Sequence, residues 1–149
     1  MSTYTEEVGD KLNTLLERTY DAEKGFKKAA ENVKDANLKS YFERKAQERY
    51  DFGHQLKSEI KSFGQDTEKG GSVAGTAHRA WMDVKALFSS DDEESMLEES
   101  IRGEEKALSD YDDILNEISL PLSTKNILEE QRAHIAEGLS KIKQLEDLR

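Results

Sequence analysis

The chain has 149 residues, of which 36% are charged and 35% hydrophobic, with a formal net charge of -10 and no cysteine. This composition fits one domain with a narrow apolar core and excludes disulfides, thiolate metal sites and cysteine nucleophiles. The acidic balance argues against nucleic acid and anionic membranes as partners, because both attract a basic surface.

The N-terminal residues are polar and acidic and lack the apolar region of a signal peptide. Apolar runs stay well short of the roughly 20 residues that a membrane span needs. We therefore expect a soluble, cytoplasmic protein.

Two long amphipathic helices are predicted over residues 4–34 and 36–63, because apolar residues recur there at steps of three and four. Asp35 can cap the second helix by accepting its first free backbone N–H groups, and Gly64 is suited to end it. The link between the two helices is so short that they must form an antiparallel hairpin.

A shorter helix is predicted over residues 73–88, followed by long helices over residues 91–118 and 122–148. The short helix carries an apolar stripe formed by Val73, Ala77, Trp81, Val84 and Phe88. A helix of this length is marginal alone in water, so its stripe needs a surface to cover it. That surface belongs either to the chain's own bundle or to a second copy of the chain, and we expect the second copy, in a homodimer.

Together these elements predict an all-α fold in which four long helices form one bundle. The short additional helix lies in the crossover between the second and third long helices. One long crossover of this kind is the ferritin-like topology.

Several stretches carry a resemblance to a known family: DAEKGF at 21–26, RYDFGHQL at 49–56, GTAHRAWMDVK at 75–85 and RGEEKAL at 102–108. With them the chain resembles the bacterial ferritin-like four-helix-bundle proteins called domain of unknown function 2383. The resemblance implies a ferritin-like bundle without an assigned activity, in a neighbourhood often linked to bacterial stress responses. It implies no catalytic residue.

A ferritin-like di-iron site takes one Glu from each of two helices and a Glu-x-x-His from each of the other two. The nearest equivalents in this chain are Glu23, Asp51 with His54, Glu104, and Gln131 with His134. The helical period turns Asp51 and His54 away from the apolar stripe of their helix and toward water. The second helix instead points Lys45 and Arg49 inward.

An inward guanidinium changes the chemistry of the bundle centre. Arg49 can satisfy a buried carboxylate with two charge-assisted hydrogen bonds and would repel a divalent cation. We therefore predict a buried polar network in place of a di-metal centre, composed of Glu23, Lys45, Arg49, Glu104, Gln131 and His134.

The favoured function is a non-enzymatic structural, stress-linked or interaction protein without a cofactor. The alternative is an iron or manganese protein, either a di-metal oxidase or peroxidase or a simple metal binder, with Glu23, Glu48, Glu104 and His134 as ligands. A third hypothesis is a small-molecule binder that uses the gap between helices.

Overall fold

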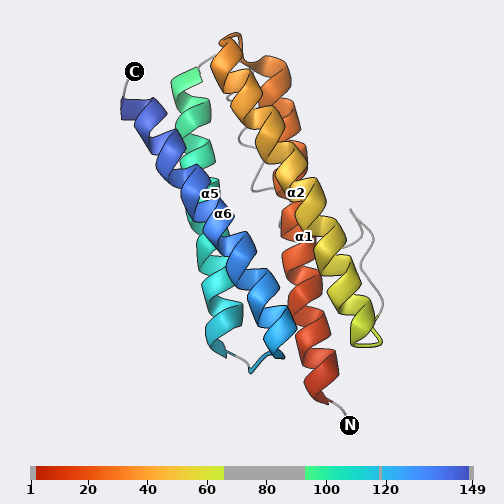
Figure 1. The fold of residues 1–149 in the computed structure, drawn as a ribbon. Coiled ribbons are helices and arrows are strands. Elements are labelled where there is room, and N and C mark those ends of the chain that lie inside the picture. The colour runs from red at the N-terminus through yellow and green to blue at the C-terminus, as the bar shows by residue number, and fades with distance from the viewer. Residues whose placement is uncertain (1–2, 66–92, 118, 148–149) are drawn as a thin grey trace.

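The computed structural model describes residues 3–65, 93–117 and 119–147. They form helices α1 (Thr3–Asn32), α2 (Ala36–Ser62), α5 (Glu93–Glu117) and α6 (Leu122–Asp147), shown in Figure 1. The predicted all-α four-helix bundle is confirmed, and each long helix begins and ends within two residues of its predicted bounds. The helix predicted over residues 73–88 and the association stripe on it lie outside the described residues.

Local sequence explains how the first hairpin turns. The carboxylate of Asp35 accepts hydrogen bonds from the backbone N–H groups of Asn37 at 2.8 Å and Leu38 at 3.1 Å, which caps α2. Beyond the other end of α2, Gly64 has a φ of 74°, a left-handed conformation that glycine adopts without strain. None of the described helices is long and apolar enough to cross a membrane.

The four helices form two antiparallel hairpins, α1–α2 and α5–α6, which pack side by side (Figure 1). Contacts between the hairpins join α1 to α5 and α2 to α6, so α2 and α5 lie across a diagonal of the bundle. The colours in Figure 1 show that α2 and α5 run in the same direction, so the end of α2 and the start of α5 lie at opposite ends of the bundle. The affiliation with ferritin-like proteins stays a prediction.

The apolar core consists of two clusters stacked along the bundle axis. The upper core cluster lies near the α1–α2 turn and contains Ala22, Phe26, Ala29, Ala30, Val33, Leu38, Tyr41, Phe42, Ala46, Met96, Leu97, Leu139 and Ile142. The lower core cluster lies at the opposite end and contains Val8, Leu12, Leu15, Leu16, Phe52, Leu56, Ile60, Tyr111, Ile114, Leu128 and Ile135. Leu108, which is partly buried, packs against both clusters.

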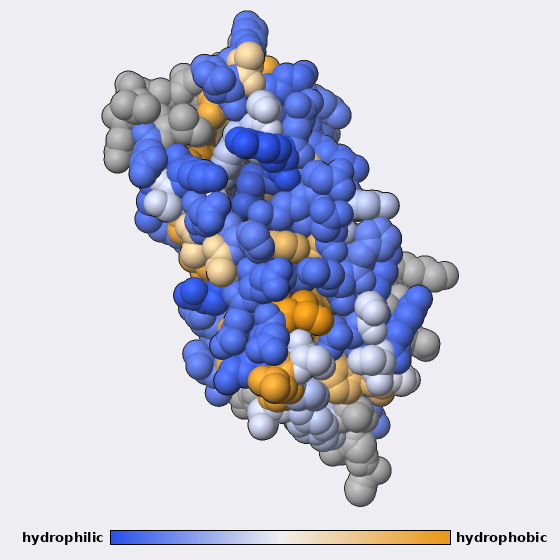
Figure 2. All heavy atoms as spheres, in the orientation of Figure 1, coloured by the Kyte–Doolittle hydropathy of each residue, from blue (hydrophilic) through white to orange (hydrophobic). Residues whose placement is uncertain are grey.

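The surface reflects the high content of charged residues. Figure 2 shows a face that is almost entirely hydrophilic, with small separate apolar areas. On this face, charged and polar side chains cover most of the narrow apolar core expected from the composition.

Candidate functional site

A layer of buried charged residues lies between the two core clusters. Lys45 and Arg49 come from α2 and Glu104 comes from α5, and their exposed fractions are 5%, 2% and 1%. On α5, Glu104 lies between Leu97 of the upper cluster and Tyr111 of the lower cluster. We call Lys45, Glu48, Arg49 and Glu104 the ionic layer.

The central interaction of the ionic layer is a two-armed ion pair between Arg49 and Glu104. Nη1 of Arg49 lies 3.3 Å from Oε2 of Glu104, and Nη2 donates a second, shorter hydrogen bond to Oε1. Because α2 and α5 lie across the diagonal, this pair passes through the centre of the bundle and joins the two hairpins.

Lys45 and Glu48 complete the charge balance. Nζ of Lys45 lies 2.6 Å from Oε1 of Glu48 and 3.7 Å from Oε2 of Glu104, and Nη1 of Arg49 also contacts Glu48 at 3.1 Å. The layer therefore pairs two cations with two carboxylates and is neutral as a unit. This balance matters because an unpaired charge in an apolar interior carries a large desolvation penalty.

The surroundings keep Arg49 charged. Its guanidinium carbon lies 5.4 Å from the ring centre of Phe26 and 5.9 Å from that of Phe52. Burial alone lowers the pKa of Arg49, but the charge and hydrogen bonds of Glu104 raise it, and the resulting pKa lies above the ordinary value. Arg49 is thus a permanent internal cation.

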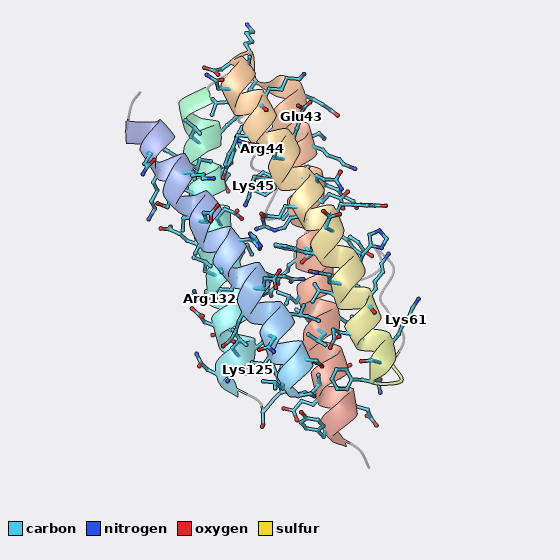
Figure 3. The ribbon with its side chains drawn as sticks, in the orientation of Figure 1. Glu43, Arg44, Lys45, Lys61, Lys125 and Arg132 are labelled. Carbon is cyan, nitrogen blue, oxygen red and sulfur yellow. The ribbon has the colours of Figure 1, made fainter. Side chains whose placement is uncertain are left out.

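Gly138 on α6 leaves room for the ammonium group of Lys45. A Cβ atom at Gly138 would lie 2.5 Å from Nζ of Lys45, closer than van der Waals contact permits. The hydroxyl of Tyr41 donates a hydrogen bond of 3.1 Å to the carbonyl of Gly138. In Figure 3, Lys45 reaches from α2 toward the α5–α6 hairpin. Sequence periodicity alone did not indicate a role for Gly138, since a glycine carries no apolar pattern.

Gln131 belongs to a second polar chain. Its Oε1 accepts a hydrogen bond of 2.6 Å from Tyr111, and its Nε2 donates one of 2.8 Å to Gln55. Burial raises the pKa of Tyr111 and of Tyr41, so both hydroxyls remain protonated at neutral pH. Gln131 is therefore buried, as its position on the helix predicted. Its hydrogen bonds connect α5 to α2, and none of those that the structure shows reaches the ionic layer.

Two residues of the predicted network lie elsewhere. Glu23 is nearly buried, with its side chain 12% exposed, but its carboxylate pairs with Lys27 on the same helix at 3.0 Å. His134 is exposed and its ring centre lies 6.3 Å from that of Phe52. The structure thus brings Lys45, Arg49 and Glu104 together and adds Glu48.

The described residues do not fit a di-metal centre. Both oxygens of Glu104 face cationic nitrogens, and the candidate ligand Glu48 contacts the same two cations. The other two candidate ligands lie apart, Glu23 beside Lys27 and His134 beside Phe52. Within the described segments there is also no group of three or more His, Asp or Glu residues placed to hold a metal ion. A divalent cation would have to displace Arg49 and Lys45 to reach these carboxylates.

A shallow pocket of about 160 Å³ lies between α1 and α5. Leu15 and Ile114 contribute its apolar lining, and Arg18 and Asp110 form an ion pair across it. A comparable ion pair, between Arg132 and Asp112, joins α6 to α5. Figure 3 shows Arg132 on the α5 side of α6. The α1–α5 pocket bears on the hypothesis of a small-molecule binder, and two of its charged lining residues, Arg18 and Asp110, already pair with each other.

The fold and the ionic layer define an all-α four-helix bundle with a charge-paired centre. The family model described as Domain of unknown function (DUF2383) matches residues 7–117, and the chain belongs to this family. The match includes Lys45, Arg49 and Glu104 and ends before α6. No curated protein matches the chain.

Proposed function

We propose that this chain is a non-enzymatic bundle in which the protein's own cations stand where a ferritin-like bundle would hold a metal pair. The observation that supports the proposal is the contact between the Arg49 guanidinium and both oxygens of Glu104. The positive charge of the guanidinium cancels the negative potential with which this carboxylate would attract a divalent cation.

The role of the ionic layer in this proposal is to fix how the two hairpins align. Each hairpin sets its own alignment through a short turn, but α2 and α5 have no such link. Sliding one hairpin by a helical turn, about 5.4 Å, would separate Arg49 from Glu104 and leave both charges buried without each other. The free-energy penalty of the shifted arrangement thus favours one alignment of the two hairpins. A single buried polar residue fixes the alignment of helices in a coiled coil in the same way.

The wider assignment combines this structural role with the expectations drawn from the sequence. We infer a structural, interaction or stress-linked bacterial protein of the cytoplasm that acts as a homodimer without a cofactor. The alternative, an iron or manganese oxidase, peroxidase or metal binder, requires Glu104 to exchange its cationic partners for metal.

Replacing Arg49 and Glu104 together by leucine tests the register role. Because both charges disappear together, we expect stability to change little, while the hairpins adopt more than one alignment. Amide NMR spectra should then show additional resonances, or light scattering should show a changed oligomer size.

A matched control replaces Arg18 and Asp110 by leucine, since this pair also joins the hairpins but its arginine side chain is 43% exposed. The control should keep one set of resonances. If the Arg49/Glu104 variant also keeps a single state with unchanged oligomer size, the register role is wrong.

A further inference from the structure

The two halves of the bundle are held together by different kinds of contact. In the lower half, polar side chains tie one hairpin to the other: Thr124 donates to Glu59 at 2.6 Å, and Gln131 donates to Gln55 at 2.8 Å. At the same end, Tyr4 donates to the carbonyl of Ser119. Just below the ionic layer, Arg18 pairs with Asp110.

In the described residues, the upper half joins the hairpins mainly through the apolar side chains of the upper core cluster, with one polar contact, the hydrogen bond from Tyr41 to the carbonyl of Gly138. Phe26 and Phe42 stack at 6.1 Å within the α1–α2 hairpin, and this cluster also contains Leu97 of α5 and Ile142 of α6. Apolar contact is not directional, so it resists a small separation of the helices less sharply than a set of aligned hydrogen bonds does.

The ionic layer forms the boundary between these halves. Separating the two hairpins at the upper core cluster leaves Arg49 and Glu104 in contact. Separating the hairpins further, through the ionic layer, would break this ion pair inside the bundle. Separating the two hairpins above the ionic layer is therefore easier than separating them through the layer.

From these contacts we propose that the bundle opens in two stages, with the ionic layer as the stop between them. In the first stage the upper ends of the two hairpins separate while the lower half stays closed (Figure 1). The opened state exposes an apolar surface that includes Phe26, Phe42 and Leu97. The second stage is global unfolding.

Native-state hydrogen exchange on the full chain tests this order. Helices that lose their tertiary packing are marginal in water, so amides of the upper half exchange during the first stage. We expect amides at residues 38–46 to exchange at least about tenfold faster than those at residues 52–60 of the same helix. Equal exchange free energies in both segments would overturn the proposal.

A matched pair of leucine variants separates two-stage opening from simple fraying. Leu38 and Leu56 are both buried on α2, in the upper and lower core clusters respectively. Leu56→Ala should accelerate exchange of the lower segment by about thirtyfold or more and that of the upper segment by a clearly smaller factor, since Leu56 stays packed in the first stage. Leu38→Ala should accelerate both segments, because Leu38 is exposed in both stages.

If Leu56→Ala accelerates both segments by the same factor, the bundle opens as one unit and the proposal fails. Should Leu56→Ala not fold, Ile60→Val offers the same comparison at another buried lower-cluster position, with a factor of about threefold or more.

Discussion

Replacing Glu104 by alanine should lower the free energy of unfolding by about 3–5 kcal/mol, because it leaves Arg49 and Lys45 as buried cations without their shared carboxylate. Glu104 is 1% exposed, so water cannot take over its role without reorganising the core. The nearby Glu48 contacts both cations but cannot balance two positive charges. Urea denaturation followed by circular dichroism measures the loss.

Glu23→Ala is the matched control for this prediction. Glu23 is also a nearly buried glutamate, but its partner Lys27 is 63% exposed and lies on the same helix. Removing Glu23 should therefore change stability by less than about 1 kcal/mol. Similar losses for Glu23→Ala and Glu104→Ala would contradict the central position that we give to Glu104.

Gly138→Ala should destabilise the bundle by about 1 kcal/mol or more, although alanine is the better helix former by about that amount. The reason is the distance of 2.5 Å between a Cβ at this position and Nζ of Lys45. The ammonium group would have to move away from Glu48 and Glu104, and the hydroxyl of Tyr41 also lies close, at 3.5 Å. Urea denaturation of the variant measures the effect.

Two comparisons isolate the contact with Lys45. Gly53 also lies within a helix, but a Cβ there would meet its nearest atom, in Tyr20, at an ordinary 3.4 Å, so Gly53→Ala should be neutral or stabilising. In a Lys45→Ala background, Gly138→Ala should likewise stop being destabilising. The same loss in both backgrounds would show that Lys45 does not cause it.

Helical periodicity was sufficient to predict the four long helices and most of their buried faces, but it did not predict which partner a long, flexible side chain contacts. Lys45 and Arg49 lie in the apolar stripe of α2, so their inward direction follows from the sequence. Glu23 occupies an equally inward position, yet its flexible side chain turns to Lys27 one helical turn away. The sequence does not reveal this choice, because each option satisfies the carboxylate.

Contacts between helices depend on rotations that periodicity does not determine. His134 was expected in the buried polar network, but it is exposed, with its ring beside that of Phe52. On the same helix, Gln131 contacts Tyr111 and Gln55, and Gly138 lies against Lys45. The role of Gly138 becomes visible only in the folded structure, where α6 packs against α2.

The metal content of the protein tests most directly whether its own cations occupy the bundle centre. The chain is purified from cells grown with added iron and manganese, and bound metal is measured by mass spectrometry alongside a Glu23→Gln/Glu104→Gln variant. A Glu43→Gln/Glu137→Gln variant, which changes two exposed carboxylates, controls for metal held at the surface. We predict far less than one metal per chain, with no difference among the three proteins. About two metals per chain, lost only from the Glu23/Glu104 variant, would contradict the account and establish a di-metal centre.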